Sequence, residues 1–303
     1  MRILRGICFL ILLNFLLFIG IASAFGAGGD EGGGAEISVI DRYGREVALD
    51  GPAERIVSLA PGITETVFAL GYGDRLVGRT SYCDYPPETG GIPVAGTLSE
   101  PDIEVVLAMD PDLVVASTHF TEESLRLLES VGLTVAVLKG ERSFDGIYDG
   151  VIRPLSHLLG DPEAGERLVA AMESTVEDAR AKAARRQRSP TVYYVVGFGE
   201  GGDWTAGGGT FIGRMIALAG GENIAEDVDG WSYSLEALVA GNPDVILVPE
   251  RFVDRFVVTP IYADLRAVRE GHVYGVDEDA FSREGPRIAE AFVSLVDVLG
   301  EVP

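Results

Sequence analysis

The sequence predicts an α/β protein with two α/β lobes, mostly parallel sheets and one long rigid helix that joins the lobes. Short apolar segments alternate with helical segments on both sides of the chain's middle, a pattern typical of parallel sheets covered by helices. Residues 161–188 form a long segment without a helix breaker. A helix–turn–strand motif occurs once on each side of this segment. These observations together predict two similar halves and a connector.

Composition limits the classes of partner. The 303 residues carry 24 Lys and Arg against 47 Asp and Glu, a formal net charge of −23. A hydrophobic fraction of 47% is typical of a chain with buried cores and argues against a disordered protein. Because so negative a surface repels phosphate backbones, we expect no nucleic-acid partner. A monomer is expected as well.

The N-terminus has the features of an export signal. Arg2 and Arg5 precede an apolar run at 7–21, and residues 22–24 (Ala-Ser-Ala) match a small-x-small cleavage site. Residues 25–36 are glycine-rich and are expected to form a flexible tether. We therefore predict a signal peptide over 1–24 and a periplasmic or other extracytoplasmic location. A retained N-terminal membrane anchor is the alternative.

The cysteines are few. Cys8 lies inside the predicted signal, so cleavage would leave Cys83 alone and would preclude an intramolecular disulfide. We expect Cys83 to be a buried thiol, because a catalytic cysteine needs a base partner that the sequence does not place.

The N-terminal lobe is predicted over residues 37–160. Two short strands around a glycine-containing turn come first, followed by strands and helices in alternation. The expected strands are 37–40, 46–49, 55–59, 112–116 and 134–138. The expected helices are 64–70, 122–131 and 143–159, the last with a kink at Pro154.

The connecting helix is predicted over 161–189. Asp161 is a suitable N-cap and Pro162 suits the first helical position. Arg185, Arg186 and Arg188 lie at the other end, where positive charge complements the helix dipole. The alternative is an ordinary surface helix within one domain.

The C-terminal lobe is predicted over 190–303. Its glycine-rich stretch, 197–209, encloses the sequence Asp203-Trp204-Thr205. The expected strands are 191–196, 244–248 and 271–274. The expected helices are 210–219, 234–240 and 286–299.

An internal repeat relates the two lobes. Residues 103–115 and 235–247 match at equal spacing, with an offset of 132 residues. In both, a helix of about two turns leads into Asp/Asn-Pro-Asp and a buried strand, and proline ends the helix by moving its predecessor out of the helical region. The same unit is therefore expected in each lobe, related by a pseudo-twofold axis.

The repeat places Glu104 and Glu236 in the first turns of equivalent helices. One interpretation is that each glutamate complements a helix N-terminus. The other is that two matched, exposed carboxylates dock onto a symmetric partner that carries Arg or Lys.

The sequence offers little support for catalysis. His119, His157 and His272 are far apart, so we expect no protein-bound metal, which needs two or three such ligands together. Residues 197–202 lack the glycine spacing and the following helix of a dinucleotide loop. We predict that the protein is not an enzyme. A secreted hydrolase or sensor domain on the same scaffold is an alternative, because fold does not fix function.

Several motifs suggest a family. Residues 55–61 (RIVSLAP) with Thr64-Glu65, residues 80–87 (TSYCDYPP) and residues 219–224 (AGGENI) resemble the substrate-binding proteins of ABC importers for vitamin B12 and ferric siderophores. The resemblance implies two lobes on one long helix and a ligand held between them. It also implies delivery to an importer permease and, through it, to an ATPase. Because one stiff helix spans the lobes, we expect little opening.

The resemblance also implies site residues. The family docks one glutamate of each lobe on permease arginines, and these positions match Glu104 and Glu236. The vitamin B12 branch is the most similar, which implies a corrinoid (cobalamin-like) ligand, since aromatic faces can cover a large macrocycle. The ligand-binding residues implied are Tyr82, Trp231, Asp279 and Arg283, with Trp204 as a further candidate.

Two positions depart from the B12 branch. Leu98 stands where that branch has a cleft tryptophan, and Ser117 stands at another aromatic position. A ferric siderophore, haem or another iron chelate is therefore the alternative ligand. We expect no cofactor, although the ligand can itself contain cobalt or iron.

Overall fold

The computed structural model describes residues 37–199 and 202–302. The predicted signal at 1–24 and tether at 25–36 lie outside these residues. Contacts divide the chain into Met1–Gly33 and Gly34–Pro303, and all that follows concerns the second unit. Within the described residues, none of the helices combines the length and apolar character that crossing a membrane requires.

The N-terminal lobe contains a four-stranded parallel sheet in the order β4-β3-β5-β6. A separate antiparallel hairpin pairs β1 with β2. The bounds are β1 Ile37–Ile40, β2 Glu46–Leu49, β3 Ile56–Ser58, β4 Leu76–Arg79, β5 Leu113–Ala116 and β6 Val135–Val137. Strands β3, β5 and β6 are wholly buried, which explains why Ser58 is the one polar residue in them. The sequence predicted five of these strands and missed β4.

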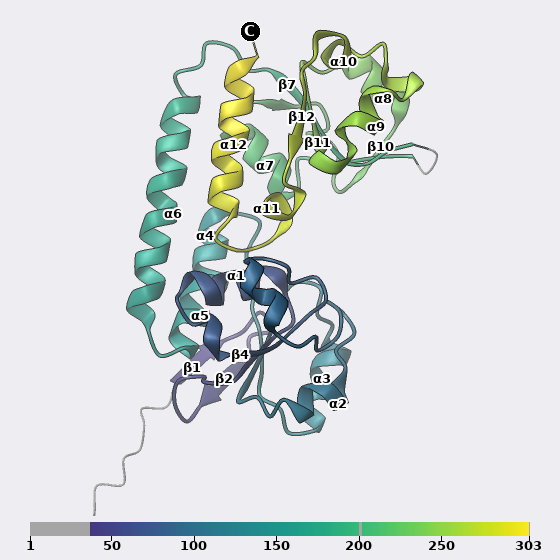
Figure 1. The fold of residues 1–303 in the computed structure, drawn as a ribbon. Helices are drawn as coiled ribbons and strands as arrows, with labels where there is room; N and C mark the ends of the chain where they lie inside the picture. Colours follow the sequence, from purple (N-terminus) through teal and green to yellow (C-terminus); the bar gives the residue numbers. More distant parts are fainter. Residues whose placement is uncertain (1–36, 200–201, 303) are drawn as a thin grey trace, which may run out of the picture. The chain divides into compact units, whose positions relative to one another are not determined.

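Helices and short 3-10 turns connect these strands (Figure 1). They are α1 Pro61–Ala69, η1 Gly73–Arg75, η2 Pro87–Gly91, α2 Ile103–Ala108 and α3 Glu122–Ser130. Helix α1 starts three residues before its predicted start, because Pro61 takes the first helical position. Gly71 and Gly132 follow α1 and α3 with φ of 90° and 87°, a left-handed backbone that favours glycine.

The predicted helix at 143–159 is divided by a π-helical turn. It consists of α4 Phe144–Ile147, the π turn η3 Tyr148–Ile152 and α5 Arg153–Leu158. Pro154 has no N–H to donate to the carbonyl of Gly150. That carbonyl instead accepts the backbone N–H of Lys139 at 3.2 Å. The irregularity expected at Pro154 is therefore a π turn just before it.

The connecting helix α6 spans Pro162–Ala183 and runs beside α12 Ile288–Glu301 (Figure 1). As predicted, the Asp161 side chain caps it by accepting the N–H of Ala164 at 2.9 Å. The predicted end at 188–189 is wrong, because the Arg186 guanidinium turns to donate to the carbonyls of Ala219 and Val296. The first turn of α6 packs on the core of the N-terminal lobe and the rest on that of the C-terminal lobe.

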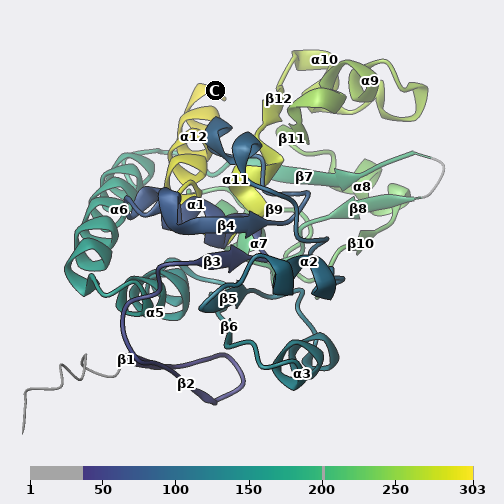
Figure 2. The ribbon, with the colours of Figure 1, turned by 60° about the horizontal axis from the view of Figure 1, so that its bottom comes forward.

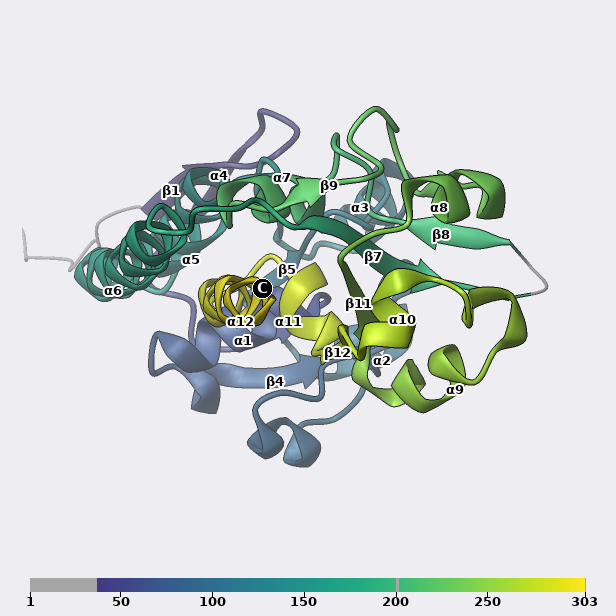
Figure 3. The same ribbon diagram turned by 90° about the horizontal axis from the view of Figure 1, so that it is seen from above.

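The C-terminal lobe is built on a six-stranded mixed sheet in the order β10-β8-β7-β11-β12, with β9 beside β7 (Figures 2 and 3). The pairs of β7, β9, β11 and β12 are parallel, and β8 and β10 are antiparallel additions. The bounds are β7 Thr191–Gly197, β8 Asp203–Thr205, β9 Glu222–Asn223, β10 Ser232–Tyr233, β11 Val245–Pro249 and β12 Val273–Val276. The sequence did not predict β8, β9 or β10.

The helices of this lobe follow the predicted order and add short segments between β11 and α12. They are α7 Phe211–Leu218, α8 Leu235–Gly241, η4 Glu250–Phe252, α9 Val253–Val257, η5 Pro260–Tyr262, α10 Arg266–Glu270, α11 Glu278–Ser282 and α12. Phe144 of α4 packs edge-to-face on Phe211 and Phe292, with ring centroids 5.3 Å apart in both pairs. A helix that precedes α6 thus contributes to the core of the C-terminal lobe.

The internal repeat is confirmed in detail. The residues before the two prolines, Asp110 and Asn242, both have a left-handed backbone, with φ of 47° and 37°. The aspartates after the prolines also have equivalent roles. Asp112 accepts the backbone N–H of Glu54, just before β3, at 2.7 Å, and Asp244 accepts that of Thr191, the first residue of β7, at 2.9 Å. The expected two-lobed α/β fold with one connecting helix is confirmed.

Candidate functional site

A groove of about 240 Å³ lies where the loops after β3 and β5 face the segment that follows α11. Its N-terminal wall comprises residues 59–62, Tyr82, Leu98 and residues 117–119. Its C-terminal wall comprises Asp279 and residues 282–284. The carboxyl ends of parallel strands are a common position for ligand sites. The groove therefore has the location that the two-lobed fold predicts for a ligand.

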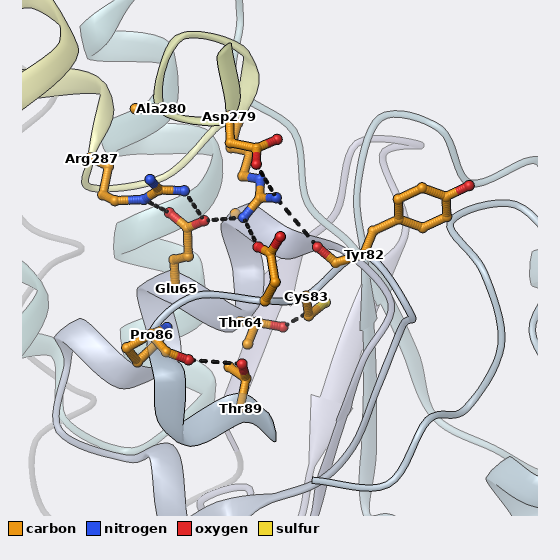
Figure 4. A network of polar contacts seen from close by, with 12 residues as sticks. Thr64, Glu65, Tyr82, Cys83, Pro86, Thr89, Asp279, Ala280 and Arg287 are labelled. Carbon is orange, nitrogen blue, oxygen red and sulfur yellow. Dashed lines mark hydrogen bonds and ion pairs between the residues drawn. The ribbon is translucent and has the colours of Figure 1, made fainter. Parts of the chain in front are cut away.

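Beneath the groove, a buried glutamate of α1 joins the two lobes. The Glu65 side chain is 2% exposed, and its Oε1 accepts from Arg283 Nη1 at 2.8 Å. Arg287 binds the same carboxylate in a bidentate manner, Nε to Oε2 at 2.9 Å and Nη2 to Oε1 at 2.8 Å (Figure 4). A buried carboxylate is stable only when it is paired and hydrogen-bonded in this way.

Arg283 has an acceptor for each of its four Nη hydrogens. Besides Glu65, its Nη1 donates to Asp84 Oδ1 at 2.7 Å. Its Nη2 lies 2.9 Å from Asp279 Oδ2 and 3.3 Å from the carbonyl of Tyr82. Burial alone would lower the pKa of Arg283, but the carboxylates outweigh it and raise that pKa. The guanidinium is therefore held charged at the base of the groove.

The two outer carboxylates differ in their environment. Burial raises the pKa of Asp279. The positive charge of Arg283 lowers this pKa and the negative charges of Asp84 and Asp277 raise it, and overall it lies above its ordinary value. For Asp84, burial would also raise the pKa, but the hydrogen bond and charge of Arg283 lower it overall. Asp279 is thus the more readily protonated of the pair.

In a second contact between the lobes, the carboxylate comes from the C-terminal lobe and its hydrogen-bond donors come from the N-terminal lobe. Glu284 follows α11, and its Oε2 accepts from Thr118 Oγ1 at 2.8 Å, the N–H of Gly140 at 3.1 Å and Ser117 Oγ at 3.4 Å. A Cβ on Gly62 would lie 2.6 Å from the carbonyl oxygen of Glu284, so the two backbones touch. Glycine is required at this close approach.

The structure brings three of the five predicted ligand-binding residues together. Tyr82, Asp279 and Arg283 line the groove, and the Tyr82 side chain is 54% exposed with its ring pointing away from the ion pairs (Figure 4). The departures Leu98 and Ser117 also line it.

The two tryptophans lie elsewhere: Trp204 is on β8, and Trp231 comes just before β10, the strand that pairs antiparallel with β8. Trp204 on β8 pairs with Ser232 of β10, and the N–H of Thr205 donates to the carbonyl of Trp231 at 2.7 Å. Their side chains are 46% and 45% exposed. Neither lines the groove described above, so a role for Trp204 and Trp231 in ligand binding stays a prediction.

Sequence reasoning assigned no role to several groove residues. His119, Thr118 and Glu284 line the groove and Glu65 lies beneath it. Glu65 belongs to the RIVSLAP-xx-TE motif quoted above, but its partners are 218 and 222 residues away in the sequence. No local pattern could have found that pairing.

Glu104 and Glu236 are exposed residues of the first turns of α2 and α8. Both helices lie on the side opposite α6 (Figures 1, 2 and 3). The N-caps of these helices are Asp102 and Ser234, which accept the N–H groups of Val105 and Ala237 at 3.1 Å. The N-cap hydrogen bonds are thus made without the two glutamates, whose exposed carboxylates lie in the first turns as both interpretations require.

Among the described residues, no three His, Cys, Asp or Glu side chains form a group that could hold a metal ion. Cys83 is buried, as expected, within 3.1 Å of the hydroxyls of Thr64 and Thr80. A further hollow of about 360 Å³ lies between α4, α6 and α7, and none of the predicted site residues lines it.

Comparison with known proteins agrees with this arrangement. An ABC transporter substrate-binding lipoprotein of Bacillus subtilis is 29% identical over 86% of this chain and 84% of its own length. A cobalamin-binding protein of Halobacterium salinarum is 31% identical over 85% of this chain and 72% of its own. A solved periplasmic heme-binding protein from Roseiflexus sp. RS-1 superposes with a TM-score of 0.76 and 33% identity, covering 82% of this chain and 99% of its own.

The family model described as periplasmic binding protein matches residues 56–280, which include the groove walls up to Asp279 and the whole of α6. This match confirms the resemblance seen in the sequence motifs. The chain belongs to the periplasmic binding protein family.

Proposed function

We propose that the protein captures a corrinoid ligand between its two lobes and delivers it to the permease of an ABC importer, without covalent chemistry. The observation that carries the proposal is the groove between the lobes, which lies at the ends of β3 and β5 and is lined by the exposed ring of Tyr82. The relative named for cobalamin binding, with 31% identity over 85% of this chain, supports the ligand class.

The groove suits part of a macrocycle. Leu59, Pro61 and Leu98 offer apolar contact, and Thr118 and Asp279 offer polar groups at the rim. Its volume of about 240 Å³ is below the roughly 300–1,000 Å³ of enclosed ligand pockets. A corrin ring would therefore insert one edge and leave the remainder against the flanking surfaces of the lobes.

Haem is the second candidate ligand. The solved heme-binding protein from Roseiflexus sp. RS-1 has 33% identity and a TM-score of 0.76 to this chain. The flat iron chelate would use the same aromatic and apolar contacts. Ferric siderophores remain within the same class of metal chelates.

Delivery would follow docking on the permease. In this proposal Glu104 and Glu236 pair with permease arginines, one from each lobe, because both are exposed on equivalent helices. The predicted signal over 1–24 would export the chain to the side of the membrane where such permeases collect their ligands.

Binding is the test. Residues 25–303 would be titrated with cyanocobalamin, haemin and a ferric hydroxamate siderophore, with calorimetry and tryptophan fluorescence as readouts. We expect cyanocobalamin to bind with a dissociation constant below about 10 μM, or −6.8 kcal/mol. If none of the three chelates binds at this level, the proposed function is wrong.

A further inference from the structure

We infer that the groove selects chelates with a neutral or cationic rim, such as amide-bearing corrinoids, and rejects chelates with carboxylate or other anionic rims. Asp84 and Asp279 are the residues that impose this selection. The inference rests on the proposed function and specifies the chemistry of its ligand.

The groove has one strong cation to offer an anion. Among the residues that line it, Arg283 is the sole Lys or Arg, and it lies beside the carboxylates of Asp279 and Glu284. An anionic ligand in this groove would therefore depend on Arg283 for charge pairing.

Arg283 has little capacity left for such a ligand. Its Nη1 and Nη2 carry four hydrogens between them and face four acceptors: Glu65 at 2.8 Å, Asp84 at 2.7 Å, Asp279 at 2.9 Å and the carbonyl of Tyr82 at 3.3 Å. Its side chain is 10% exposed. To reach an Nη hydrogen, an incoming carboxylate would have to displace Asp84 or Asp279, and the Nε–H is the one remaining donor of the guanidinium.

The surrounding charges are also unfavourable to an anion. Two arginines are accompanied by more carboxylates than they can neutralise: Glu65, Asp84, Asp277, Asp279 and Glu284. An anion that enters the groove would be repelled by these like charges, and solvent and salt screen part of the repulsion because Asp84, Asp277 and Asp279 are 65%, 56% and 43% exposed. Against this background, amide or hydroxyl groups on a ligand rim can donate to the carboxylates instead.

Two corrinoids with the same ring system allow amide and carboxylate rims to be compared directly. Dicyanocobinamide carries amides around its rim, whereas dicyanocobyrinic acid carries carboxylates at the corresponding positions. Binding of each to residues 25–303 would be measured by calorimetry at pH 7.5, in 50 mM and in 500 mM NaCl. We expect the amide form to bind at least tenfold more tightly at 50 mM, with a smaller ratio at 500 mM because salt screens charges.

A paired substitution tests the two named residues. Asp84→Asn with Asp279→Asn would release Arg283 from two of its carboxylates while Glu65 still holds it. We expect the affinity ratio of amide to carboxylate form to fall at least fivefold. The control is Asp74→Asn with Asp178→Asn, which removes the same charge at exposed positions outside the groove and should leave the ratio unchanged.

The outcomes are distinct. Equal affinity for the two corrinoids, or equal effects of the two double variants, would overturn the charge selection and leave the proposed function standing. Tight binding of haemin, which carries two propionates, with no binding of either corrinoid would also overturn it. Failure of all chelates to bind overturns the proposed function and the inference with it.

Discussion

Glu65 of α1 and Arg287, just before α12, form a bidentate ion pair across 222 residues of sequence, with N–O distances of 2.9 and 2.8 Å. The glutamate is 2% exposed and the arginine 13%. Arg287 also binds Asp277 and lies over the ring of Tyr85 at 4.2 Å. The two lobes are thus joined by the helix α6, by this buried ionic contact and by the contacts of Glu284, which supports the expectation of little opening.

Glu65→Gln should destabilise the fold strongly. The substitution leaves Arg283 and Arg287 buried without their shared countercharge, and such losses cost about 3–5 kcal/mol. Urea unfolding of residues 25–303 gives the free energy of unfolding. The control Glu123→Gln, at an exposed position, should change it by less than about 0.5 kcal/mol. Equal effects of both variants would show that the pair does not hold the lobes.

Gly62→Ala tests the backbone contact between the lobes. Its Cβ would lie 2.6 Å from the Glu284 carbonyl oxygen, a contact that side-chain movement cannot relieve. We expect a loss of about 1–3 kcal/mol in the free energy of unfolding, although alanine favours a helix. Gly51→Ala is the matched control, because no atom lies within 4 Å of its added Cβ. A stabilised Gly62→Ala protein would contradict the close packing.

The sequence predicted the order of strands and helices because buried parallel strands are continuous apolar runs. It missed β4, where Gly78 interrupts the apolar run: the side chain of Met109 packs over this glycine, and its sulfur would lie 2.4 Å from a Cβ placed there. It missed β8 and β10 because glycines flank them and the strands are short. Pairing with neighbours makes them strands: β8 pairs with β7, and β10 pairs with β8.

The candidate site was predictable only in part. Tyr82, Asp279 and Arg283 were implied by family motifs, and the structure places all three in one groove. Glu65 lies in such a motif too, yet its role depends on arginines that reach it from the far end of the chain. Ion pairs of this separation have no periodicity or spacing that a single sequence could show.

Asp244 should contribute to acid unfolding. Burial would raise its pKa, but hydrogen bonds from Thr191 and the charges of Arg266 and Arg188 lower it below the ordinary 3.8. A lowered folded-state pKa stabilises the protein above the unfolded-state value, and this contribution is lost as pH falls through the folded-state value. Between pH 6 and 3 the wild type should therefore lose more stability than Asp244→Asn. Parallel curves of unfolding free energy against pH would contradict this assignment.

Glu104→Ala with Glu236→Ala should abolish uptake and leave ligand affinity within about twofold. Both side chains are exposed and lie outside the groove, so the substitutions would remove contacts with the permease and leave the ligand site intact. Uptake would be measured in vesicles that contain the cognate permease and ATPase. Glu123→Ala with Glu163→Ala removes two other exposed first-turn glutamates and should transport normally. Weakened ligand binding in the Glu104→Ala, Glu236→Ala variant would contradict the assignment of these two residues to docking.

Trp231→Ala and Trp204→Ala decide whether the ligand extends beyond the groove. The two residues are half-exposed, Trp204 on β8 and Trp231 just before the adjacent β10, and a macrocycle larger than the groove needs a second surface. If they supply it, each substitution should weaken binding by about 1–3 kcal/mol, or roughly 5- to 150-fold, the range of an aromatic anchor. Ile261→Ala, at a residue that is also half-exposed and does not line the groove, is the control. Wild-type affinity in both tryptophan variants would confine the ligand to the groove and its Tyr82 wall.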